Sequence, residues 1–143
     1  MAIAIGNVVG GRLANIQPIK ILIKLFIGQA IVLLLFFFTV NSKIPAAITL
    51  FFMGGLSFAT VPGLQLYIVQ LAGKYLPGTE DIASSLNISA FNLGVAIGAW
   101  VGGAAANNAA LGLHATPWIG ALIVLLGAIL AIYSYRDQQR SPK

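Results

Sequence analysis

The chain has 143 residues and no cysteine; 59% of its residues are hydrophobic, 8% are charged, and the net charge is +5. Because a soluble domain averages about 25% charged residues, this composition excludes an ordinary water-soluble globule and indicates a membrane protein. The absence of cysteine excludes disulfides and thiolate metal sites. The positive charges are scattered between apolar runs and do not form the basic patch typical of nucleic-acid binding, so no nucleic-acid partner is expected.

Four apolar stretches are each long enough to cross the hydrocarbon core of a bilayer, which takes roughly 20 helical residues. They cover residues 21–40, 44–71, 82–106 and 117–135. A backbone in lipid must satisfy its own hydrogen bonds, so each stretch is predicted to be an α-helix. Residues 1–11 are apolar but too few to span, and we interpret them as the end of a helix that begins outside the chain. The predicted fold is an all-α membrane protein with four full transmembrane helices and a partial N-terminal helix.

The connections between the spans carry turn and helix-start signals. Pro77 and Gly78 form a turn signal between the second and third spans. Thr116 and Pro117 are typical of a helix start, with a capping residue followed by a proline at the first helical position. The fourth span is therefore expected to begin at Pro117.

The basic residues predict the orientation in the membrane. If the segment before Ile21 lies in the cytoplasm, seven of the eight Lys and Arg residues fall on the cytoplasmic side and only Lys43 lies outside. The positive-inside rule then predicts a multi-pass membrane protein whose C-terminus is cytoplasmic. Residues 136–143 are expected to form a cytoplasmic tail.

The second span holds a proline among small and polar residues. Pro62 removes a backbone hydrogen bond and predicts a kink, while Gly55, Ala59 and Gly63 are spaced four apart. One interpretation is a bent helix satisfied by its neighbours, and the other is a helix that lines a substrate cavity. Polar groups beside the kink favour the second interpretation. The candidate cavity residues are Ser57, Thr60, Pro62 and Gln65.

The third span has a small residue at every fourth position, which places these residues on one face of a helix. The stripe consists of Ala90, Gly94, Gly98, Gly102 and Ala106. Such a face allows close packing against another helix, and in a transporter it can also form the moving seam between two halves. Packing is the simpler interpretation. In the same span, Asn87 and Asn92 are expected to hydrogen bond between helices.

The four predicted spans contain no Asp or Glu, although a proton-coupled carrier needs a titratable group within the membrane. If the chain belongs to such a carrier, the proton site must lie elsewhere. The sequence also lacks a phosphate-binding loop, a metal-ligand cluster and a nucleophile with a base. We therefore predict neither enzyme activity nor a cofactor or metal site.

The segment GNVVGGRLANIQPIK, residues 6–20, resembles the loop signature of the major facilitator superfamily (MFS), which joins the second and third helices of each half. Asn15 stands where that signature usually has an aspartate. Residues 59–103 are similar to the C-terminal half of the arabinose-efflux-permease-like and drug:proton antiporter branch of that family. The loop-motif residues are Gly11, Arg12, Leu13, Ala14, Asn15 and Lys20.

The resemblance implies that residues 1–143 are a partial C-terminal MFS domain, part of a six-helix bundle. The implied segments are the end of helix 8 (1–11), helix 9 (21–40), helix 10 (44–71), helix 11 (82–106), helix 12 (117–135) and the tail (136–143). Helix 10 would line the cavity, and helix 11 would face the other half of the transporter.

The implied function is that of a secondary active efflux permease of the cell inner (cytoplasmic) membrane, a proton antiporter for small organic solutes such as sugars or drugs. The implied partners are the lipid bilayer, the missing N-terminal half, the substrate and protons. The chain alone is not expected to transport, because alternating access needs two bundles. The alternative is a free-standing four-helix membrane protein that oligomerises through its glycine-rich faces.

Overall fold

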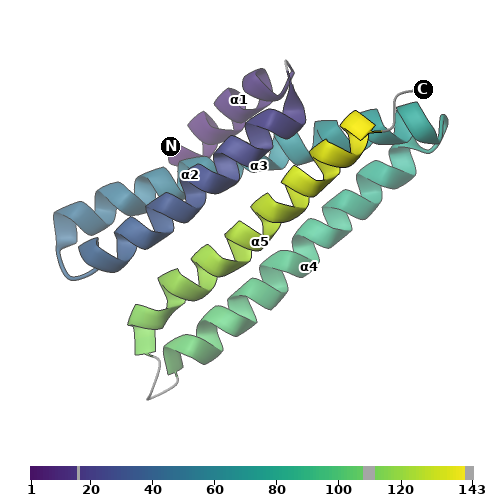
Figure 1. Cartoon of the computed structure of the whole chain (residues 1–143). Coiled ribbons are helices and arrows are strands. Elements are labelled where there is room, and N and C mark those ends of the chain that lie inside the picture. Colours follow the sequence, from purple (N-terminus) through teal and green to yellow (C-terminus); the bar gives the residue numbers. More distant parts are fainter. Residues whose placement is uncertain (16, 108–111, 141–143) are drawn as a thin grey trace.

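The structure, a computed structural model, describes residues 1–15, 17–107 and 112–140. These residues form five helices and no strand: α1 (Ala2–Ala14), α2 (Pro18–Thr39), α3 (Lys43–Tyr75), α4 (Glu80–Asn107) and α5 (Gly112–Arg140). Four of them, α2 to α5, are long and apolar enough to cross a membrane. The prediction of an all-α membrane protein with four spans and a shorter N-terminal helix is confirmed (Figure 1).

The last helix differs from its predicted bounds at both ends. It begins at Gly112, so Pro117 lies inside it and not at its first position. It also continues to Arg140, because residues 136–140 contain no glycine or proline and consist largely of good helix formers. The first five residues of the predicted tail therefore extend α5, and residues 141–143 lie outside the described residues.

The turn between α3 and α4 follows its sequence signal. Gly78 has a φ of +90°, a backbone conformation that glycine adopts without steric cost. The Thr79 hydroxyl donates a hydrogen bond to the Leu76 carbonyl oxygen at 2.7 Å. The predicted turn at Pro77 and Gly78 is confirmed, and it reverses the chain within a few residues.

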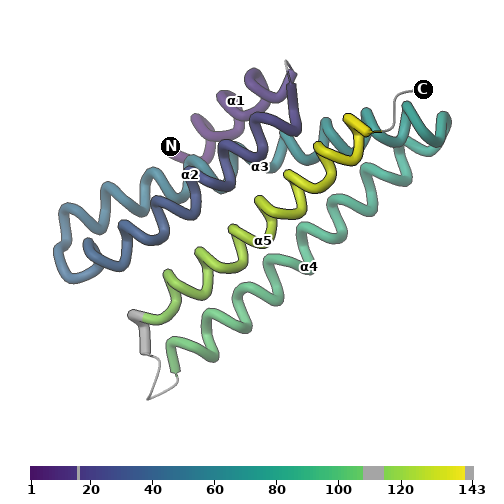
Figure 2. Tube along the Cα trace, viewed as in Figure 1, coloured from purple at the N-terminus to yellow at the C-terminus, as the bar shows by residue number. Residues whose placement is uncertain are grey.

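The helices run up and down in succession, as the trace in Figure 2 shows. α1 packs directly on α3, and α2 packs on both α3 and α5. Within the described part of the chain, α4 contacts only α3 and α5. The core consists of Leu22, which is fully buried, with Ile19 and Tyr67. Most other large apolar side chains are exposed, as expected of a surface that faces lipid.

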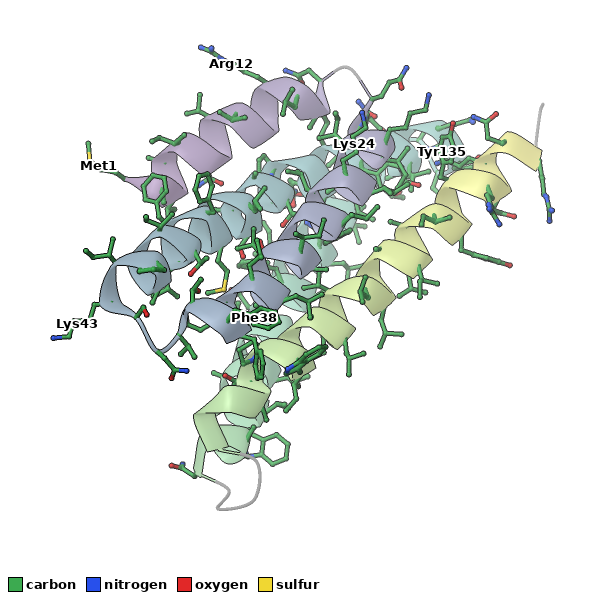
Figure 3. The ribbon with its side chains drawn as sticks, turned by 60° about the vertical axis from the view of Figure 1, so that its left-hand side comes forward. Met1, Arg12, Lys24, Phe38, Lys43 and Tyr135 are labelled. Atoms are coloured by element: carbon green, nitrogen blue, oxygen red, sulfur yellow. The ribbon has the colours of Figure 1, made fainter. Side chains whose placement is uncertain are left out.

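The up-and-down course gathers most of the charges at one end of the bundle. Figure 3 shows Arg12 and Lys24 at that end, with Tyr135 close by, and Lys43 at the opposite end. The ends of α3 and α5 and the start of α4 lie with Arg12 and Lys24. The positive-inside rule predicts that the end with most of the basic residues, here called the crowded end, lies in the cytoplasm.

The orientation can be tested by labelling single cysteines with a membrane-impermeant thiol reagent in intact cells. We expect Ser42→Cys to be labelled, and Gln139→Cys to be labelled only after the cells are permeabilised. The chain has no cysteine of its own, so the background is clean. Labelling of position 139 but not of position 42 in intact cells would reverse the predicted orientation.

Candidate functional site

A small polar cluster joins α3 to the first turns of α4. Gln65, one turn after Pro62 on α3, donates a hydrogen bond from Nε2 to Ser84 Oγ on α4. Asn87, three residues after Ser84 and on the same face of α4, donates from Nδ2 to Gln65 Oε1 at 2.6 Å. Hydrogen bonds of this kind between membrane helices stabilise their association by about 0.6 kcal/mol each on average. The Gln65 amide therefore uses both of its polar atoms to bridge the two helices.

A groove of about 530 Å³ opens beside this cluster, between α3 and α4. Its polar groups are three side-chain amides, and its walls are aliphatic and aromatic. The lining residues are Val61, Leu64, Gln65, Asn87, Ile88, Ala90, Phe91 and Asn92. Apolar walls with a few polar groups are typical of sites for small organic molecules. Since the lining has no charged side chain, the groove offers hydrogen bonds and apolar contact but no ion pair.

Of the four candidate cavity residues on α3, the structure places only Gln65 in the groove lining. Thr60 is 9% exposed, and its hydroxyl donates to the Ser57 carbonyl oxygen of the same helix at 2.7 Å. Pro62 faces α1, because a Cβ on Gly11 would lie 3.8 Å from the Pro62 Cβ. Thr60 and Pro62 thus lie away from the groove.

The groove includes residues that sequence reasoning did not assign to a cavity. Asn87 forms the expected hydrogen bond between helices, but it also lines the groove. Ser84 was not singled out, although its position three residues before Asn87 puts both on one helical face. Phe91, a further turn along, gives the groove its aromatic wall.

The closest helix contact in the structure lies between α1 and α3, in what we call the α1–α3 seam. It pairs Gly6 with Gly55, Gly10 with Ala59, and Ala14 with Gly63. A Cβ on Gly6 would overlap the Gly55 carbonyl oxygen, and a Cβ on Gly10 would lie 2.6 Å from the Ala59 Cα. The residue numbers increase in the same direction along both helices, so α1 and α3 run parallel with their backbones in contact.

Sequence reasoning noted the small residues of α3 in this seam but not those of α1. The signal was present, because Gly6, Gly10 and Ala14 are also spaced four apart. Two of the residues assigned to the loop motif lie in or next to the seam. Ala14 is fully buried, and Gly11 lies beside Pro62.

The other loop-motif residues are not brought together. Arg12, Leu13 and Asn15 are exposed around the end of α1. Lys20 is exposed on the first turns of α2, where its Nζ lies 5.7 Å from the centre of the Tyr135 ring on α5. The motif residues therefore shape the α1–α2 connection, and they do not form a charge cluster in the described structure.

The three glycines of the α4 stripe have no close neighbour within the described chain, whereas Ala90 lines the groove between α3 and α4 and Ala106 is partly buried. A Cβ at Gly94, Gly98 or Gly102 would meet no atom within 4 Å. The whole stretch from residue 88 to residue 100 is exposed, and Trp100 has 75% of its surface free. The stripe that looked most suited to close packing is thus uncovered, while the α1–α3 seam is closed.

Comparison with known proteins relates the chain to membrane transporters. The chain is 45% identical over 140 residues to "Uncharacterized MFS-type transporter YtbD" of Bacillus subtilis (strain 168). It is 30% identical over 147 residues to "Uncharacterized MFS-type transporter YfhI" of the same organism. Each match covers 98% of this chain and 35% of the relative. "Inner membrane transport protein YdhP" of Escherichia coli (strain K12) is 38% identical over 136 residues, covering 94% of this chain and 33% of the relative. The chain thus spans about one third of the length of these relatives. No protein-family model and no solved structure matches it.

Proposed function

Since the chain is similar along nearly its whole length to MFS-type transporters, we propose that it forms the C-terminal part of a permease that exports small organic solutes by proton antiport. The assignment of its helices to helices 8 to 12 of such a permease belongs to this proposal. So does its location in the inner membrane, which the printed name of the Escherichia coli relative supports.

The groove between α3 and α4 is the observation that carries the proposal. It combines neutral amides with apolar walls, and two of the three amides already hold each other in a fixed geometry. A solute with an apolar body and a few hydroxyl or amide groups fits this chemistry. In the permease, the groove would be this chain's side of the substrate path.

The uncovered face of α4 supports a partner beyond this chain. α4 has the lowest mean hydropathy of the four candidate spans, and its exposed part carries Ser89 and Asn92 as well as the glycine stripe. Polar and small residues are disfavoured against lipid but suit a helix–helix interface. We assign this face to the N-terminal half of the permease, consistent with relatives about three times as long as this chain. Their length also favours this assignment over a free-standing oligomer of the chain.

The proton site would lie in that other half. The three acidic residues of the chain are Glu80 and Asp81 at the start of α4 and Asp137 near the end of α5. All three sit at the crowded end of the bundle, outside the apolar middle of the helices. If the coupling group is a carboxyl within the membrane, it would therefore have to come from outside this chain.

The proposal is tested by replacing Gln65 in the intact transporter. We expect Gln65→Leu to lower export about tenfold at unchanged membrane abundance, because the groove loses an amide and the polar atoms of Ser84 and Asn87 lose their partner. Export of a panel of sugars and drug-like dyes, measured in everted vesicles and normalised to abundance, gives the readout.

Thr60→Val is the matched control on the same helix. It removes a hydroxyl that is bonded within α3 and lies away from the groove. Export by this variant should stay within about twofold of the parent. If Gln65→Leu exports as well as Thr60→Val, the groove is not part of the substrate path.

A further inference from the structure

A second groove, of about 210 Å³, lies at the end of the bundle where α2 begins and α3 and α5 end. It is separate from the groove between α3 and α4. Its walls include Pro18 and Ile19 from α2, Tyr67, Gln70 and Lys74 from α3, and Gln138 from α5. Three helices thus bring one ammonium group and two amides to a single opening.

The floor of this groove belongs to the packed core. Tyr67 is 8% exposed, and its hydroxyl shares a hydrogen bond of 2.7 Å with Ser134 Oγ on α5. Ile19, which also lines the groove, packs with Tyr67 in the hydrophobic core. The helices that form the opening are therefore held together by the hydrophobic core and by this hydrogen bond.

The polar side chains at the rim form no hydrogen bond or ion pair within the described residues. Lys74 Nζ lies 5.0 Å from the centre of the Tyr75 ring and makes no ion pair with any described carboxylate. The amides of Gln70 and Gln138 likewise form no hydrogen bond in the described part of the chain. In addition, α2 begins at Pro18 without a side-chain cap, which leaves first-turn N–H groups at this rim. All of these groups except the amide oxygens are donors, so the rim is suited to an anion.

The surrounding charges favour the same kind of ligand. The end of the bundle that holds this groove carries six basic side chains among the described residues: Arg12, Lys20, Lys24, Lys74, Arg136 and Arg140. The three acidic residues only partly offset them. Figure 3 shows Arg12 and Lys24 spread across this end. Basic pockets between membrane helices at the level of the headgroups are suited to anionic lipids.

We propose that this groove binds the phosphate group of an anionic phospholipid from the leaflet that faces this end of the bundle. Lys74 supplies the charge, and Gln70 and Gln138 donate hydrogen bonds to the phosphate oxygens. Leu71, also in the wall, and the exposed apolar sides of the helices accommodate the acyl chains. Phosphate is the chemistry that the site recognises, and free phosphate from solution is the other possible source of it.

The test compares lipid adducts by native mass spectrometry of the full chain, released from detergent micelles that contain phosphatidylglycerol or phosphatidylcholine. We expect the chain to retain phosphatidylglycerol in preference to phosphatidylcholine. Lys74→Gln should weaken the retention of phosphatidylglycerol about fivefold. Lys24→Gln removes one positive charge from the same end but not from the groove, and it should change retention by less than about twofold.

Inorganic phosphate, added against an equal ionic strength of chloride, identifies the source of the ligand. Displacement of phosphatidylglycerol by phosphate alone would mean that the site also takes phosphate from solution, and absence of displacement assigns it to the lipid. Equal retention of the two lipids, or equal loss in Lys74→Gln and Lys24→Gln at matched helix content by circular dichroism, would overturn the proposal.

Discussion

Gly10→Ala is expected to destabilise the bundle by about 3 kcal/mol, although it adds only one methyl group. The new Cβ would lie 2.6 Å from the Ala59 Cα and would overlap the Ala59 carbonyl oxygen. Both are backbone atoms, so no side chain can rotate out of the way, and α1 must move away from α3. The free energy of unfolding, measured by titration with sodium dodecyl sulfate in mixed micelles, should fall by this amount.

Gly11→Ala is the matched control at the adjacent position. A Cβ there would lie 3.8 Å from the Pro62 Cβ, which is an ordinary van der Waals contact. Alanine also has a higher helix propensity than glycine, so this variant should be as stable as the parent or more stable by up to about 1 kcal/mol. Equal unfolding free energies for the two alanine variants would mean that the α1–α3 seam does not hold the bundle together.

Gly98→Leu is expected to have the opposite pattern, with normal stability of this chain but loss of export in the intact transporter. A Cβ at position 98 meets no atom within 4 Å, so the leucine has room in the isolated bundle. In the transporter that we propose, the same face packs on the N-terminal half, and a large side chain there would separate the two backbones. We expect export to fall at least tenfold at near-normal membrane abundance.

Ile97→Leu tests the same helix beside the stripe. Ile97 is 52% exposed, and the replacement leaves the stripe of small residues intact. Export by this variant should match that of the parent transporter. If Gly98→Leu exports as well as Ile97→Leu, then α4 is not an interface between halves, and its exposed stripe needs another explanation.

The fold class could be predicted from the sequence because hydrophobicity and length alone specify membrane helices. The four spans and the turn at Gly78 follow from local residues, and the structure confirms them. The ends of the last helix could not be predicted in the same way. Pro117 signals a helix start, but it is also tolerated within α5, and the residues after Tyr135 continue the helix without any apolar pattern.

The positions of the polar residues were harder to predict, because they depend on which face of a helix meets which neighbour. Gln65 and Thr60 both lie close to Pro62 in the sequence, yet Gln65 lines the groove and Thr60 is buried on another side. The same holds for the glycines. A spacing of four residues marks a face that permits close approach, but the stripes on α1 and α4 have the same spacing, and only the one on α1 is covered in this chain.

The parallel pairing of α1 with α3 also sets an order of events during synthesis. Ala59 emerges from the ribosome roughly 50 residues after Gly10, which takes several seconds at about 5–20 residues per second. Within the described part of this chain, α1 has few other contacts, because it packs only lightly on α2. The glycine-rich face of α1 is therefore synthesised before the helix that covers it. Only after α3 has entered the membrane on the correct side of α2 can α1 pack against it. Errors in membrane insertion at this stage would leave α1 without its contacts to α3.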